Sequence, residues 1–213
     1  MASSTRPYDR CVFVNCPFDS AYKPLLDVVL FTIHDCGFIA RTALENKGAA
    51  ELRLDKIVRI IRESRWSIHD ISRVDWTPES PLPRFNMAFE CGLALGIQRF
   101  GGKKDRNRDF LILAGKPYED KQTLSDLAGQ DAAYHDGRPD RTITAVRSFL
   151  ASKSLTQVRG AASIGRRCDQ FRAELPDLAR KLSITEEEIL SFDYVPDLLH
   201  LMISWQRDRS AEP

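Results

Sequence analysis

Short apolar runs alternate with longer amphipathic stretches through the first 150 residues, and this alternation constrains the fold more than any other feature of the sequence. The runs with strand character cover residues 11–15, 38–43, 66–71, 110–113 and 132–134. The stretches with helical periodicity cover residues 22–36, 52–65, 84–100 and 143–151. Such alternation is typical of a parallel sheet covered by helices on both faces. The sequence therefore predicts an α/β protein with an open parallel sheet of about five strands.

The strand signal ends near residue 155, and only helical patterns follow. They cover residues 165–181, a segment that starts near Ser183 with Thr185 as a candidate N-cap, and residues 195–205. The last pattern carries a stripe of Leu, Met and Trp that must pack on the sheet domain or on another copy of the chain. We therefore expect an α/β domain over residues 1–154 and a helical extension over 155–213 used for packing or oligomerisation.

Charge and composition exclude several classes of protein. The 213 residues include 31 Lys and Arg against 30 Asp and Glu, and this balance argues against a binder of polymeric nucleic acid or a polybasic membrane protein. The apolar runs are too short to span a bilayer, and the first residues lack a secretory pattern. The five cysteines form no C-x-x-C pair, and four lie within apolar stretches. We expect buried free thiols in the cytoplasm, and no metal site from the scattered histidines.

Polar and aromatic residues gather where the expected strands end. In an open α/β sheet, ligands bind outside the carboxyl ends of the strands, so these positions form one candidate site. The residues concerned are Asn15, Phe18, Asp19, Tyr22, Arg41, Asp70, Ser72, Arg84, Asn86 and Glu90. Together they offer groups suited to a sugar, a phosphate and a ring, which favours a nucleotide-sized ligand. Two alternatives stay open: Phe18 and Tyr22 as core residues, and Asp70 as a cap for the adjoining backbone.

Glu90 is the most informative single position. It lies in an otherwise apolar, small-residue helical segment that must pack closely, so its carboxylate is either partly desolvated or exposed on the outer face. Burial without a full partner would raise its pKa and prepare it for chemistry. The competing interpretation is a solvent-facing glutamate, or one paired with Arg73 or Arg84. Asn86 lies one helical turn earlier and is expected to share the same helical face.

Several common motifs are absent from the sequence. No G-x-G-x-x-G follows the first strand, and neither a P-loop nor a G-x-S-x-G nucleophile elbow occurs. Cys16 directly follows the first strand, a position suited to a nucleophile, but no matched histidine accompanies it. A dinucleotide-binding Rossmann site, a P-loop site and a serine hydrolase site are therefore disfavoured.

Three segments resemble a known superfamily. Residues 12–19, 68–72 and 85–96, the last reading Phe-Asn-Met-Ala-Phe-Glu-Cys-Gly-Leu-Ala-Leu-Gly, resemble nucleoside 2-deoxyribosyltransferases and bacterial TIR-like domains, which share a flavodoxin-like layout. The resemblance covers roughly residues 10–135. It implies chemistry at an N-glycosidic bond, with Glu90 attacking or stabilising the anomeric carbon and Asp70 positioning the sugar hydroxyls or the base. It also places Asn15, Phe18 and Asp19 in the first ligand loop.

The resemblance leads to one main hypothesis and two alternatives. The main one is a TIR-like glycohydrolase that cleaves NAD or a related nucleotide as its substrate, needs no further cofactor, and serves bacterial defence after assembly into a homo-oligomer. A nucleoside or nucleotide deoxyribosyltransferase or hydrolase is the second enzyme hypothesis. A non-catalytic nucleotide-binding or assembly module is the third.

Overall fold

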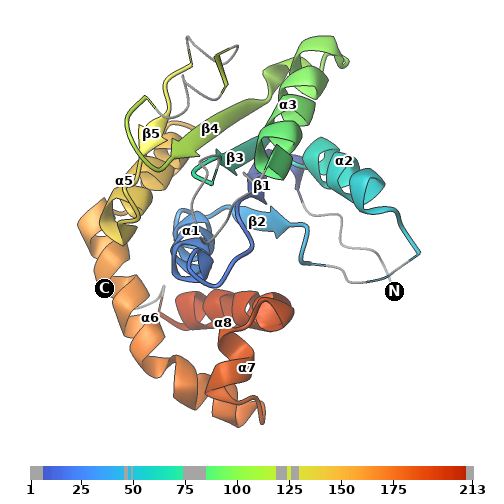
Figure 1. Ribbon diagram of the computed structural model, residues 1–213. Helices are drawn as coiled ribbons and strands as arrows, with labels where there is room; N and C mark the ends of the chain where they lie inside the picture. Colours follow the sequence, from blue (N-terminus) through green and yellow to red (C-terminus); the bar gives the residue numbers. More distant parts are fainter. Residues whose placement is uncertain are drawn as a thin grey trace.

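A computed structural model describes residues 7–45, 48, 50–73, 85–118, 124–125 and 130–209 of the chain. Its centre is an open sheet of five parallel strands in the order β2-β1-β3-β4-β5 (Figure 1). The strands are β1 (Cys11–Asn15), β2 (Ile39–Thr42), β3 (Trp66–Asp70), β4 (Asp109–Ala114) and β5 (Ala133–Tyr134). The expected flavodoxin-like α/β class is therefore confirmed.

Helices cover both faces of this sheet, and a helical segment follows it. The helices of the first part are α1 (Lys23–Asp35), α2 (Arg53–Glu63), α3 (Phe85–Phe100) and α5 (Pro139–Ala151), with short 3-10 turns η1 (Tyr8–Arg10) and η2 (Asp105–Asn107). The later elements are α6 (Ala161–Lys181), α7 (Glu186–Leu190), the 3-10 turn η4 (Phe192–Tyr194) and α8 (Val195–Asp208). The expected C-terminal helices are thus present.

Two helices begin earlier than the sequence pattern indicated. Helix α5 starts at Pro139 rather than at 143, because proline in the first turn has a fixed φ suited to a helix and needs no hydrogen-bond acceptor. Helix α6 starts at Ala161 rather than at 165, and two alanines, the best helix formers, open it. The expected N-cap is confirmed: Thr185 and Glu188 form a reciprocal capping box at the start of α7.

Strand side chains divide between two faces with different cover. Val12, Val14 and Ile68 point into a large apolar cluster shared with α1 and α5. Phe13, which points the other way, joins a smaller cluster that includes Ile60 of α2. We call these the α1 side and the α3 side, after the helix nearest the centre of each.

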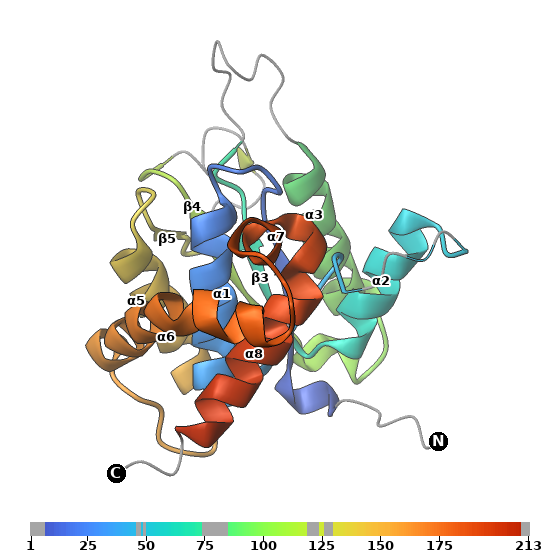
Figure 2. The same ribbon diagram turned by 90° about the horizontal axis from the view of Figure 1, so that it is seen from below.

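The C-terminal helices pack on the outer surface of α1 and extend its core (Figure 2). The Phe31 ring lies 5.7 Å from the ring of Phe171 and 5.9 Å from that of Trp205. A buried ion pair between Asp35 and Arg167, 2.9 Å apart, joins α1 to α6. Helices α6 and α8 therefore pack against α1.

The remaining global expectations concern membranes and thiols. Among the described residues, no helix is long and apolar enough to cross a membrane. All five cysteines are buried and free, as the sequence predicted. Buried free cysteines of this kind behave as small hydrophobic side chains.

Candidate functional site

The strand order creates a switch point at the carboxyl ends of β1 and β3. The chain leaves β1 through α1 on one face, and leaves β3 towards α3 on the opposite face (Figure 1). Connections that diverge from adjacent strands leave a crevice, which is the usual ligand position in open α/β sheets. Asn15 and Asp70, the last residues of the two strands, lie at this edge.

Asn15 fixes the start of α3 to the end of β1. Its Nδ2 donates to the carbonyl oxygen of Met87 at 2.8 Å and lies 3.0 Å from Nδ1 of His69. On the other side of the imidazole, Nε2 lies 2.9 Å from Oγ of Ser67. Burial lowers the pKa of His69 to about 3, so the ring is neutral, accepts from Asn15 and donates to Ser67. This buried network positions α3 rather than a ligand.

Asp70 lies on the α1 side of the same edge and is only 1% exposed. It accepts hydrogen bonds from the Tyr22 hydroxyl at 2.5 Å and from the backbone N–H of Ser72 at 2.9 Å. Nε2 of His135 lies 3.1 Å from its Oδ2, within ion-pair range but without hydrogen-bond alignment. Both oxygens of Asp70 are thus occupied, which favours the capping interpretation weighed from the sequence.

His135 faces Asp70 in a defined orientation. The backbone N–H of Gly137 donates to its Nδ1 at 2.9 Å, so Nδ1 is an acceptor and Nε2, which faces the carboxylate, carries a proton. Burial, followed by the charge of Asp70, raises the pKa of Tyr22 well above its ordinary value. Tyr22 therefore stays a phenol and a donor to Asp70. Asp70 fastens the end of β3 to both the start of α1 and the end of β5.

The first ligand loop is closed by its own aspartate. Oδ1 of Asp19 accepts from the backbone N–H of Tyr22 at 2.9 Å and lies 3.5 Å from the guanidinium of Arg73. Arg73 is exposed, and so it presents a cation at this edge of the sheet.

Glu90 reaches the edge from α3 and differs from the other acids. It is 8% exposed, and no described side chain pairs with its carboxylate. Burial raises its pKa to about 7, against only a modest lowering by the charge of Arg53 at the start of α2. The structure thus agrees with the desolvated form of the two sequence interpretations. A carboxyl group held near neutrality can be charged or discharged by small changes around it.

Asp70 and Glu90 approach the switch point from opposite faces of the sheet. Cys16, which directly follows β1, is influenced by both acids. Burial raises the pKa of its thiol well above the ordinary value, and the charges of Asp70 and Glu90 raise it further. A thiol that stays protonated is a poor nucleophile, and the sequence also disfavours Cys16 as a nucleophile. Both acids are therefore at the predicted edge, on either side of the end of β1.

The structure places two expected ligand residues elsewhere. Phe18 packs edge to face on Phe192 of the C-terminal segment at 5.9 Å, so it is a core contact. Arg41 is buried beside α2, where Glu45 and Glu63 accept from its guanidinium at 2.7 and 2.9 Å. Its charge is used within this network and is not brought to the switch point.

Two further expected residues lie on or before the first turn of α3. Asn86 is exposed, whereas Glu90, one turn later, is buried, so the two side chains differ in their surroundings. Arg84 lies outside the described residues.

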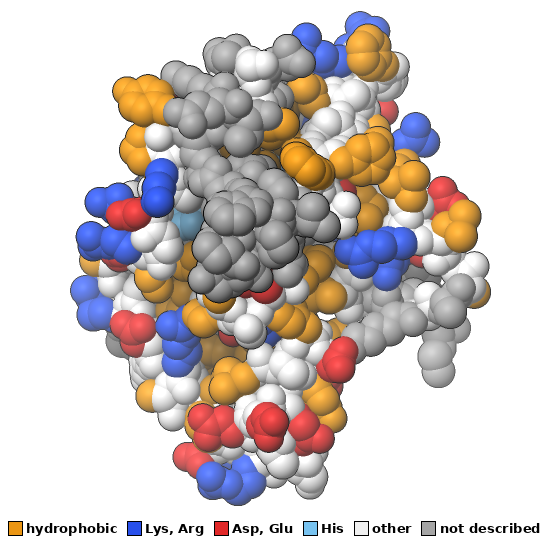
Figure 3. All heavy atoms as spheres, in the orientation of Figure 1, with side chains coloured by type: hydrophobic (Ala, Val, Ile, Leu, Met, Phe, Trp, Pro, Cys, Tyr) orange, Lys and Arg blue, Asp and Glu red, His pale blue; other side chains and the backbone are white. Residues whose placement is uncertain are grey.

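Three residues near the edge, His135, Arg53 and Phe89, escaped the sequence analysis, which left Phe85 open between a core and a stacking role. His135 directly follows β5, and applying the strand-end rule to the last strand as well would have found it. Arg53 opens α2 as an exposed cation near Glu90. Phe85 and Phe89 are exposed large hydrophobic side chains on α3, where Figure 3 shows hydrophobic side chains gathered. Phe89 directly precedes Glu90 in the chain, but its ring is exposed whereas the carboxylate is buried.

The described residues of the site form no evident metal cage. Among the described residues, no group of three or more His, Cys, Asp and Glu side chains is arranged to hold a metal ion. No family model matches the sequence, and no curated protein or solved structure matches it either. What this edge of the sheet does must therefore be argued from its own geometry.

Proposed function

We propose that the switch-point edge is an N-glycosidase site in which Glu90 faces the anomeric carbon of a nucleotide, with NAD as the leading substrate. The observation that carries this proposal is the Glu90 carboxyl group, buried next to the end of β1 without a described partner and with a pKa raised to about 7. Structural carboxylates are normally paired when buried. An unpaired one at a topological switch point supports a role toward a ligand.

Cleavage of NAD suits a single acidic residue. The bond between C1′ of the ribose and the pyridinium nitrogen breaks, and its electron pair goes to that nitrogen, which becomes neutral nicotinamide. The leaving group therefore needs no proton. The ribose becomes oxocarbenium-like, and the ionised Glu90 stabilises that positive charge. Water then adds its oxygen to C1′ and releases a proton, giving ADP-ribose.

The raised pKa of Glu90 fits a cationic substrate in particular. Without ligand, the neutral form relieves the cost of burying a charge. When a pyridinium ring binds beside it, the positive charge lowers the pKa and favours the carboxylate. Near pH 7 the site would thus hold Glu90 in both protonation states without ligand, and binding of the ring would shift it toward the carboxylate.

Other groups at the edge support binding of a nucleotide. Arg53 and Arg73 are exposed cations on the two flanks of the switch point and can meet a diphosphate. Phe85 and Phe89 offer exposed rings near Glu90 for stacking on a base. Asp70, with both oxygens occupied, serves here as a positioning residue that holds Tyr22 and His135 in place.

The direct test is incubation of the protein with NAD, followed by measurement of free nicotinamide. We expect turnover by the native chain and a loss of about 100-fold or more in Glu90→Gln, the usual scale for removing a group that stabilises the transition state. Glu187→Gln, at an exposed glutamate of α7, is the matched control and should keep full activity. A series of protein concentrations tests whether activity requires assembly into the homo-oligomer proposed for a cytoplasmic defence effector.

Two results would redirect the proposal. Release of a base from free nucleosides or monophosphates, with NAD untouched, would favour the deoxyribosyltransferase or hydrolase. Thermal stabilisation by nucleotides without turnover, equal in native protein and Glu90→Gln, would favour a binding module instead.

A further inference from the structure

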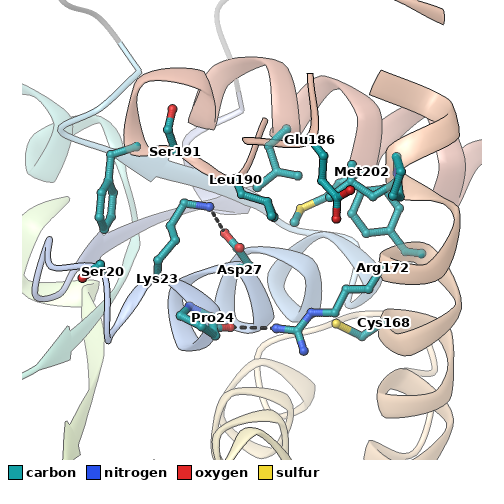
Figure 4. A pocket seen from close by; sticks show the side chains of 15 residues that line it. Ser20, Lys23, Pro24, Asp27, Cys168, Arg172, Glu186, Leu190, Ser191 and Met202 are labelled. Carbon is teal, nitrogen blue, oxygen red and sulfur yellow. Dashed lines mark hydrogen bonds and ion pairs between the residues drawn. The ribbon is translucent and has the colours of Figure 1, made fainter. Parts of the chain in front are cut away.

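A cavity lies on the α1 side, and neither Glu90 nor Asp70 lines it. It has a volume of about 660 Å³ and opens between the start of α1, the middle of α6 and the segment from α7 to α8 (Figure 4). This volume falls within the range of roughly 300–1,000 Å³ that holds small organic ligands. Protein interiors are otherwise close-packed, so a space of this size between packed helices is unusual.

Most of the cavity wall is apolar. Phe171 and Leu175 of α6, Leu190 of α7, and Leu198 and Met202 of α8 face the space. These side chains come from three helices and leave room for an aliphatic chain or an aromatic ring. The occupant therefore has an apolar body.

A buried ammonium group marks one end of the cavity. Lys23 is only 6% exposed, and its Nζ lies 2.7 Å from Oδ1 of Asp27, as Figure 4 shows. An ammonium group has three donors, and no second acceptor among the described residues takes a hydrogen bond from this one. At the rim, Arg172 donates one N–H to the carbonyl oxygen of Pro24 at 2.9 Å and has further donors to spare.

The spare donors decide the charge of the occupant. Asp27 is already engaged by Lys23, so a cationic ligand would have to displace the lysine from that carboxylate or turn to Glu186 of α7 on the cavity wall. An anionic group can instead add to Lys23 without breaking that pair. Hydrogen bonds between ionised donors and carboxylates are among the stronger ones in proteins.

We propose that this cavity binds a small organic monocarboxylate with an apolar aliphatic or aromatic body, its carboxylate held by Lys23, with Arg172 as a further cation at the rim. The site is independent of Glu90 and of the proposed glycosidase chemistry. It exists only because the C-terminal helices close over α1, which gives this segment a second use beyond packing.

The test uses the full chain and defined probes of equal length. Octanoate, octanol and octylamine are titrated by calorimetry, and we expect octanoate to bind at least tenfold more tightly than the other two. Lys23→Met removes the buried ammonium group and should weaken octanoate about tenfold or more while leaving octanol unchanged. Arg172→Met removes the charge of an exposed side chain and should weaken octanoate by a smaller factor.

Further variants keep the result interpretable. Leu190→Trp, at a half-exposed lining position, fills the cavity and should abolish octanoate binding without touching the buried ion pair. Glu90→Gln should bind octanoate with unchanged affinity, so failure of the glycosidase proposal does not affect this one. Equal binding of octanoate and octanol, tighter binding of octylamine, or octanoate affinity unchanged in both Lys23→Met and Leu190→Trp would each overturn the proposal.

Discussion

The two sides of the sheet solve different problems. On the α1 side, apolar strand residues meet α1 and α5, and α6 and α8 add a further apolar layer outside α1. On the α3 side, the apolar clusters are small, and buried polar groups stand among them: Asn15, Ser67, His69, Arg41 and Glu90. The first side can supply most of the stabilisation from apolar burial, at about 25 cal/mol per Å².

This difference teaches where the molecule can hold an unfavourable group. An unpartnered buried carboxyl group lowers the free energy of unfolding, and a protein tolerates it only when other contacts supply enough stability. The thick core of the α1 side supplies those contacts. The α3 side is then free to keep Glu90 poised at the edge of the sheet.

The largest expected effect comes from creating a cavity in the apolar core of the α1 side. Trp205 is buried, packs on Phe31 and Phe171, and donates from Nε1 to Glu174 at 2.9 Å. Trp205→Ala should lower the free energy of unfolding by about 3–5 kcal/mol, as large aromatic-to-alanine changes in cores do. Urea denaturation measures it, with the exposed aromatic variant Phe100→Ala as control. A loss no larger than that of the control would mean that the C-terminal layer contributes little.

The next effect has the opposite sign and lies on the α3 side. Because the folded-state pKa of Glu90 is raised to about 7 from 4.5, ionisation destabilises the fold. The protonated Glu90 carboxyl group contributes fully to the free energy of unfolding below pH 4.5, and this contribution is lost as the pH rises through 7. Glu90→Gln should therefore be more stable than the native chain by about 3 kcal/mol at pH 8, at about 1.4 kcal/mol per pKa unit.

The pH dependence makes that prediction specific. The advantage of Glu90→Gln should shrink toward zero between pH 7 and pH 4.5, as thermal unfolding across this range would show. Glu187→Gln, on an exposed position, should show no such trend. Equal stability of Glu90→Gln and the native chain at pH 8 would mean that the carboxylate is solvated.

A smaller loss is expected from the polar network of the α3 side. Asn15→Ala leaves the carbonyl oxygen of Met87 and Nδ1 of His69 without their donor. The free energy of unfolding should fall by about 1–3 kcal/mol, the usual effect of stranding buried polar groups. Asn86→Ala, at an exposed position of α3, is the matched control. Hydrogen exchange of the first turn of α3 should rise in Asn15→Ala alone if the network anchors that turn.

The smallest effect concerns α7, the helix that lines the cavity through Leu190. Thr185 caps α7, whose acidic first turn lies at the lower end of the molecule (Figure 3). Thr185→Ala should cost about 1 kcal/mol through loss of the capping box. Thr144→Ala, inside α5, should change stability by less. Chemical denaturation distinguishes the two, and equal values would mean that α7 does not need its cap.

The sequence predicted the fold well because its signals are local and repeated. Each strand is a short apolar run, and each helix carries an amphipathic stripe, so both elements and class follow from periodicity. Ends are less certain: Pro139 and Ala161 begin helices before any apolar stripe does. The parallel direction of the strands followed from the crossover rule.

The site was predictable by place but not by contact. The strand-end rule brought Asn15, Asp70 and Glu90 to one edge, and the apolar setting of Glu90 indicated its burial. It could not show that Asp70 is fully occupied, because Tyr22 and His135 come from distant parts of the chain. Arg41 likewise pairs with Glu63, 22 positions away, which spacing alone does not reveal.

The contact between α1 and α8 also determines how late during synthesis the fold can be completed. Nε2 of Gln206 donates to the carbonyl oxygen of Phe31, a partner 175 positions earlier in the chain. A ribosome that adds roughly 5–20 residues per second needs about 9–35 s to cover that distance. For that interval the outer face of α1 has emerged while the helix that will cover it is still unmade. The newly made N-terminal part is therefore the form of this chain most exposed to aggregation and most in need of a chaperone.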